Sequence, residues 1–154
     1  MQMDKRIIDF MRAVFPFLLA LFLWRGALPF INPAGLLVLI PVFFCTFVRP
    51  TPWFAPFGLL MCFLVDYRAD TLLFWSSVYC LCYAANGFQN VVDLTRADKD
   101  GIGAFALFFG VSVFIISVPH FVNFTNIFRA IWTVCIECAL YIPIVTLIKR
   151  LGHD

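Results

Sequence analysis

Six stretches rich in apolar residues, separated by short polar or proline-containing breaks, account for most of the chain. They cover residues 13–31, 34–48, 53–65, 71–85, 101–122 and 127–148. Such runs are typical of membrane-spanning helices, because a helix needs about 20 mostly apolar residues to cross the hydrocarbon core. We therefore predict an all-α integral membrane protein with about six short transmembrane helices, folded as a single domain over residues 1–154.

Two of the predicted spans are short. The second and third runs hold 15 and 13 residues, so as helices they would be about 23 Å and about 20 Å long. The sequence Arg49-Pro50-Thr51-Pro52 separates them, and its prolines break helical continuity. Either both helices extend through their polar flanks, or the pair forms a shallow hairpin between four longer spans.

The composition agrees with a membrane location and argues against nucleic-acid binding. Hydrophobic residues make up 63% of the chain and aromatic residues 18%, against only 11 basic and 9 acidic side chains. This balance is typical of a membrane protein. The net charge is only +2, and the basic residues form no continuous stripe for phosphates to follow. The lipid bilayer is therefore an expected partner, and nucleic acid is not.

The basic residues predict the orientation of the chain. In a six-span arrangement with cytoplasmic termini, eight of them face the cytoplasm and three face outward. The inner set is Lys5, Arg6, Arg12, Arg49, Arg96, Lys99, Lys149 and Arg150, and the outer set is Arg25, Arg68 and Arg129. This excess on one side is what the positive-inside rule expects. We predict that both termini are cytoplasmic.

A single acidic residue, Glu137, lies near the middle of the last apolar run. A carboxylate at bilayer depth is expensive, so it must face protein, water or a partner, or stay protonated. Arg129 is eight residues away on the same helix, about 12 Å along the axis, which is too far for direct pairing. Arg25 is the better partner if the first and last spans touch. Glu137 could form a structural ion pair, it could be protonated and hydrogen-bonded, or it could act in a proton or substrate relay.

A second polar cluster lies at the outer end of the third run, where Asp66, Arg68 and Asp70 surround Tyr67. Their alternate spacing distributes them around a helix, so they can pair with different neighbours. One interpretation is a solvated turn. The other is a contact surface for an external partner.

Catalytic chemistry has no support in the sequence. All six cysteines fall inside apolar runs, and Cys135-Ile-Glu-Cys138 has no second pair or nearby histidine to complete a metal or redox site. Buried cysteine behaves as a small hydrophobe, so we expect these side chains to pack. No nucleophile set, glycine-rich phosphate loop or metal-ligand spacing is present. We expect no enzyme activity, no cofactor and no metal.

The layout resembles the rod shape-determining protein MreD family of bacteria. The likeness is carried by a short basic N-terminus, by Asn32-Pro33-Ala34-Gly35 opening the second run, and by the segment from Pro56-Phe57-Gly58 to Asp66. A charged loop after the fourth run and a final run ending in Lys149-Arg150 complete it. The chain departs from the family in lacking a glycine a few residues after Asp66 and in having a more acidic loop, residues 86–100.

The resemblance implies a non-catalytic role in the bacterial inner membrane. Members of the family act with a bitopic MreC-like protein and help to couple the cytoplasmic MreB filament to the wall-synthesising enzymes of cell elongation. Asp66 is the only site residue that the resemblance carries over, as a positional match.

A different class of protein uses six short spans as well, the vitamin-binding S-components of transporters. On this alternative, Glu137, Arg25, Trp24 and Trp132 would line a cavity for a small molecule.

Overall fold

The computed structural model describes residues 2–87, 101–120 and 123–152, and these residues are helical apart from turns and one isolated bridge between Leu28 and Asn32. The elements are α1 (Gln2–Arg25), η1 (Pro33–Val38), α2 (Leu39–Phe43), η2 (Phe44–Val48), α3 (Phe54–Ala69), α4 (Phe74–Gly87), α5 (Ile102–Ser117), η3 (Val118–His120) and α6 (Phe124–Gly152). Because η1, α2 and η2 follow one another directly, we treat them as one composite helix, residues 33–48, although Ala34 and Gly35 near its start have left-handed backbone angles. The predicted all-α class and its six helical segments are confirmed.

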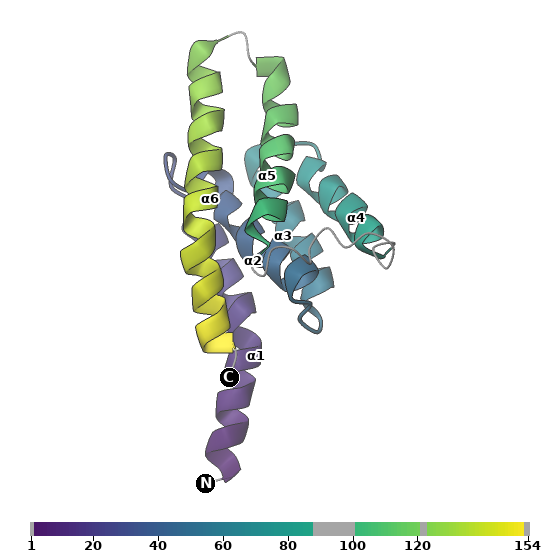
Figure 1. Ribbon diagram of the computed structural model, residues 1–154, viewed down its shortest axis with the longest axis vertical. Helices are drawn as coiled ribbons and strands as arrows, with labels where there is room; N and C mark the ends of the chain where they lie inside the picture. The colour runs from purple at the N-terminus through teal and green to yellow at the C-terminus, as the bar shows by residue number, and fades with distance from the viewer. Residues whose placement is uncertain (1, 88–100, 121–122, 153–154) are drawn as a thin grey trace.

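The helices fall into two length classes (Figure 1). The α1 helix has 24 residues and α6 has 29, which correspond to about 36 Å and about 44 Å. Both are long and apolar enough to cross a membrane. The α3, α4 and α5 helices have 14 to 16 residues, or about 21 to 24 Å. The third predicted run does extend through its polar flank, because α3 continues from Val65 to Ala69.

The prediction for the first run, residues 13–31, was wrong at both ends. The α1 helix begins at Gln2 and ends at Arg25, so the basic N-terminal segment is helical and residues 26–32 form a turn. Asn32 closes this turn, because its side-chain amide donates to the carbonyls of Leu23 (2.6 Å) and Gly26 (3.1 Å). Its Oδ1 accepts the backbone N–H of Leu37 at 2.9 Å. One buried side chain therefore ends α1 and begins the composite helix.

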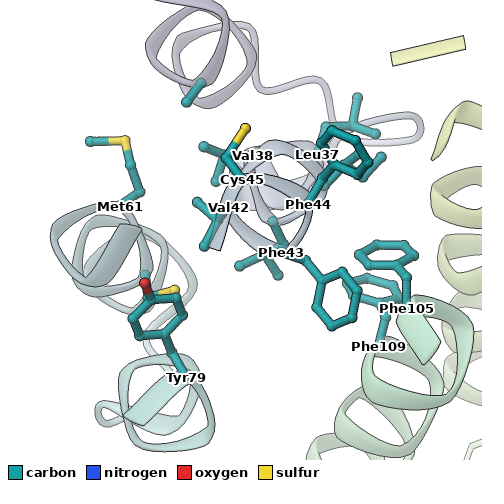
Figure 2. Packing of buried hydrophobic residues seen from close by; sticks show 14 of the residues in the cluster. Leu37, Val38, Val42, Phe43, Phe44, Cys45, Met61, Tyr79, Phe105 and Phe109 are labelled. Atoms are coloured by element: carbon teal, nitrogen blue, oxygen red, sulfur yellow. The ribbon is translucent and has the colours of Figure 1, made fainter. Parts of the chain in front are cut away.

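The composite helix forms the centre of the molecule. Every residue from 37 to 46 is buried, as expected for a helix that has neighbours on all sides. Figure 2 shows Val42 and Phe43 of this helix facing side chains from three other helices. These are Met61 of α3, Tyr79 of α4, and Phe105 and Phe109 of α5. The core is rich in aromatic pairs, such as Phe43–Phe105 with ring centroids 5.4 Å apart.

The outer faces of the long helices are apolar too. In the most apolar stretch of each long helix, only 11% of the residues of α1 and 22% of those of α6 are buried. Large side chains such as Phe22 of α1 and Phe128 of α6 are 72% and 63% exposed. The shorter helix α5 also has exposed apolar side chains, such as Leu107 at 70%. Exposed apolar surface of this extent marks a face that contacts membrane or another protein.

The bundle has two distinct ends. Both termini lie at the lower end in Figure 1, which we call the termini end; it also holds the turn 49–53. The opposite end, which we call the turn end, holds the turns 26–32 and 70–73 and the start of α6. From residue 88 onward, the predicted polar loop 86–100 lies outside the described residues.

Candidate functional site

Asp66 is the most extensively hydrogen-bonded side chain at the turn end. It lies in the last turns of α3 and is only 3% exposed. Its Oδ1 accepts the hydroxyl of Thr71 (2.5 Å) and the backbone N–H of Trp75 (2.9 Å). Its Oδ2 accepts the backbone N–H and the hydroxyl of Ser76, at 2.8 and 2.7 Å. The first N–H groups of a helix have no partner within it and favour a negative charge, so Asp66 caps α4.

This geometry corrects the predicted contact surface. Asp66 is buried and fully engaged within the chain, so it cannot contribute to a surface for an external partner. Arg68 donates from Nη1 to the carbonyl of Trp24 at 2.6 Å, and its guanidinium lies 4.6 Å from the centre of the Trp24 ring. It therefore joins α3 to the end of α1. Asp70 is exposed and ends α3 in a left-handed conformation. The three residues do not form one surface.

The turn after α3 contains three non-glycine residues with positive φ: Asp70 (54°), Leu72 (47°) and Leu73 (62°). A side chain in this conformation costs about 1–2 kcal/mol relative to the right-handed region. It is in this stretch that the family resemblance leads one to expect a glycine. The hydrogen bonds of Asp66 span the turn and hold α4 against α3, which offsets the local strain.

Two glycines, in the segments on which the family resemblance was based, have a steric role. Gly35 has φ +78°, and a Cβ there would lie 2.8 Å from the Trp24 carbonyl oxygen. A Cβ at Gly58 would lie 2.9 Å from the hydroxyl of Tyr79. That hydroxyl donates to the Ala55 carbonyl at 2.9 Å, so it is fixed between α3 and α4. Both glycines allow a close approach that a side chain would prevent.

Glu137 is completely buried, and its predicted partner is wrong. It lies on the buried face of α6, one turn from Thr133 on one side and Tyr141 on the other. Within the part of the chain that the structure describes, neither carboxyl oxygen has a hydrogen bond. Arg25 is exposed at the end of α1, and Arg129 is exposed two turns before Glu137. Because an unpaired buried charge is costly, we expect the carboxyl group to be neutral in the folded protein.

Arg129 lies beside cavities at the turn end. One is an open cavity of about 410 Å³ between the composite helix, the α3–α4 turn, α5 and α6, and its polar lining includes Arg129, Thr71 and Ser117. A second, of about 600 Å³, is lined by Arg129 with Phe30 and Trp132. The indole N–H of Trp132 donates to the Phe30 carbonyl at 3.0 Å. Of the four residues predicted to line a ligand cavity, only Trp132 lines either of these. The sequence marked Arg129 as a charged residue inside the last apolar run, but it did not show that Arg129 lines a cavity.

The cysteines form no cross-link and no metal-binding group in the described segments. All six are free thiols, with Cys135 exposed and Cys138 partly buried on α6. No group of three or more His, Cys, Asp or Glu side chains among residues 2–87, 101–120 and 123–152 could hold a metal ion.

Comparison with known proteins adds no further constraint: no family model matches the chain, and neither the curated proteins nor the solved structures give a significant match. The fold and surface define an all-helical protein with two helices that are able, by length and composition, to cross a membrane.

Proposed function

We propose that the protein is a multi-pass inner-membrane scaffold of the bacterial cell-elongation machinery, similar in role to MreD. One observation carries this proposal: three polar side chains of the turn end bind groups of the same chain, while the outer faces of the long helices are apolar. Asp66, Asn32 and Arg68 all bind groups of the same chain. A protein built in this way offers apolar helix faces to partners, which suits a scaffold.

A membrane location is supported by the exposed apolar faces of α1 and α6. In water such surface would be unfavourable by roughly 25 cal/mol per Å² of apolar area, whereas in lipid it costs nothing. The helices α3 to α5 are shorter than a hydrocarbon core of about 30 Å. Local thinning of the bilayer can accommodate this mismatch at modest cost.

The proposed orientation places the termini end in the cytoplasm. Both termini lie at that end (Figure 1), as an even number of crossings requires. Lys5, Arg6, Lys149 and Arg150 belong to the terminal segments there, and the positive-inside rule assigns such residues to the cytoplasm. Reporter fusions at residue 154 and within residues 123–126 test the arrangement. Opposite sidedness is expected, and the same sidedness at both positions would mean that α6 does not cross the membrane and that the six-span arrangement is wrong.

The proposed partner is a bitopic, MreC-like membrane protein. Helices associate in lipid through close packing and a few polar contacts, and the apolar outer faces of α5 and α6 provide the packing surface. Leu107 and Phe128 are among the most exposed side chains there.

Depletion in a rod-shaped host tests this role. We expect depleted cells to become round and the tagged protein to co-purify with its bitopic partner. Rods that keep their shape, with no partner recovered, would refute the scaffold role.

A small-molecule-binding subunit of a transporter is the second candidate, and the cavity of about 410 Å³ beside Arg129 favours it. Cavities of this size are suited to small ligands. Stoichiometric binding of a vitamin by the purified protein, lost in Arg129→Gln, would support this candidate over the scaffold.

A further inference from the structure

A separate cavity, of about 530 Å³, lies at the termini end between α1, the end of the composite helix and α6. Three basic side chains line it: Arg12 from α1, Arg49 after η2, and Lys149 from α6. In the sequence these residues are 37 and 100 positions apart, and each could be explained separately as a cation at the end of an apolar run. The fold brings all three to one site.

The lining is cationic on one side and apolar on the other. Among the described residues, Asp9 is the only acidic one in the lining, so their four charged groups sum to +2. Phe44, Pro16 and Ile148 supply apolar wall. The Lys149 ammonium lies 5.7 Å from the centre of the Phe44 ring, which shows how closely the cationic and apolar parts of the lining adjoin.

We propose that this cavity binds the phosphate of an acidic phospholipid, such as phosphatidylglycerol. The cationic side chains recognise the phosphodiester charge, since basic pockets between transmembrane helices bind anionic head groups. The acyl chains would lie against the exposed apolar surfaces of α1 and α6. A volume of about 530 Å³ lies within the range of roughly 300–1,000 Å³ that is typical of small-molecule sites, so it is large enough for a head group.

Charge and position favour a lipid over the other anions that could enter. A soluble phosphate would use the cationic groups but leave the apolar wall without a ligand. An acidic peptide from a partner would need a string of cationic contacts extending beyond the cavity. The lipid uses both parts of the lining. The proposal does not depend on the scaffold role, because a transporter subunit with this structure would bind the same lipid.

Native mass spectrometry of the full-length protein in detergent, titrated with phosphatidylglycerol or phosphatidylcholine, tests the proposal. The variant is the triple substitution Arg12→Gln, Arg49→Gln and Lys149→Gln. Its matched control is Lys5→Gln, Arg6→Gln and Arg150→Gln, which removes the same charge from the same end but from residues that do not line the cavity. We expect wild-type protein to prefer phosphatidylglycerol. The cavity variant should bind it about tenfold more weakly, or 1.4 kcal/mol, and the control should stay within about twofold of wild type.

Several outcomes would overturn the proposal. If both triple variants lost the same affinity for phosphatidylglycerol, the total positive charge of the termini end, and not the cavity, would attract the lipid. Equal affinity for the two lipids, or full displacement of phosphatidylglycerol by soluble glycerol phosphate, would exclude a lipid-specific site. Unchanged lipid binding with lost capture of a protein partner would assign the cavity to that partner. If the triple variant does not elute as folded protein, the single variant Arg49→Gln takes its place, because Arg49 is exposed. This variant should bind phosphatidylglycerol about threefold more weakly, and unchanged binding would refute the proposal.

Discussion

Two buried carboxyl groups in this protein have opposite surroundings. Asp66 accepts four hydrogen bonds, and Glu137 accepts none from the described residues. Both are nearly or completely excluded from solvent, at 3% and 0% exposure. The difference follows from where each lies on its helix. Asp66 is near the end of α3, opposite the free N–H groups that begin α4, whereas Glu137 is in the middle of α6.

The comparison teaches that burial alone does not give an acidic residue its role. At a helix start, backbone donors are available and a carboxylate satisfies them. In mid-helix the backbone donors are already used, so a buried carboxyl must find side-chain partners or remain neutral. Asp66 therefore stabilises the fold as an anion. Glu137 is a polar group that the surrounding core tolerates.

The largest expected effect is that of placing a fixed charge at Glu137. Glu137→Lys introduces an ammonium group into the buried face of α6, and we expect a loss of about 3 kcal/mol in stability and a lower amount of folded protein in membranes. Glu137→Gln exchanges one neutral polar group for another and should change stability by less than about 1 kcal/mol. Membrane abundance and unfolding by SDS titration measure both. Similar values for the two variants would show that Glu137 is charged or exposed.

The second effect tests whether Asp66 acts as an anionic cap. Asp66→Asn replaces one acceptor oxygen with an amide that must face N–H and O–H donors, so we expect a loss of about 2 kcal/mol in the free energy of unfolding. Asp70→Asn is the matched control, because Asp70 is exposed and asparagine tolerates its left-handed conformation. It should change stability by less than about 0.5 kcal/mol. If Asp66→Asn lost no more stability than Asp70→Asn, the four hydrogen bonds of Asp66 would contribute little to the free energy of unfolding.

The third effect has the opposite sign. Glu137→Met removes a buried polar group that has no hydrogen bond and fills the same space with an apolar chain, so we expect a gain of about 1 kcal/mol. The equivalent change at the other acid, Asp66→Leu, should be strongly destabilising because it leaves the N–H groups of Trp75 and Ser76 unpaired. The same SDS titration measures both variants. A destabilised Glu137→Met variant would indicate that the carboxyl group has a partner in the membrane.

The smallest effect concerns the strained turn that Asp66 holds. Leu72 is 94% exposed with φ 47°, so Leu72→Gly relieves backbone strain without removing a packing contact. Relief of the strain should stabilise the fold by about 1 kcal/mol. The flexibility of glycine in the unfolded chain cancels part of this, so we expect a net gain in stability of about 0.5 kcal/mol. Leu60→Gly, at a half-exposed position inside α3, should instead lose about 1 kcal/mol. A thermal unfolding series compares the pair, and a loss of stability in Leu72→Gly would show that the turn is not strained.

Much of the fold could be predicted because it depends on local pattern. The apolar runs and the prolines after Arg49 predicted six helical segments, and the described residues form six when residues 33–48 are taken as one composite helix. The ends of the helices were less predictable. The end of α1 depends on Asn32, whose bonds to Leu23 and Gly26 form only when the turn folds back. The central position of the composite helix was not predictable either, since apolar character alone does not show which run will have neighbours on every side.

The candidate site was predicted by residue type but not by partner. Glu137 and Asp66 were both singled out from the sequence, yet Glu137 does not bind the arginine expected for it and Asp66 is buried instead of lying on the surface. Arg68 binds the carbonyl of Trp24, 44 residues away, and Trp132 binds the carbonyl of Phe30, 102 residues away. Backbone carbonyls occur at every position, so nothing in the sequence marks which of them will meet a distant side chain.

The sequence by itself determined the helical class, the number of segments and the apolar character of nearly every surface, because these follow from the side chains of neighbouring residues. Only the tertiary structure decided which polar groups meet. It gave Asp66 its donors, left Glu137 without any, and brought Arg12, Arg49 and Lys149 to one cavity. The physical reason is range: hydrophobic burial is non-directional and can be recognised from local pattern, whereas a hydrogen bond or ion pair requires two groups within about 3–4 Å.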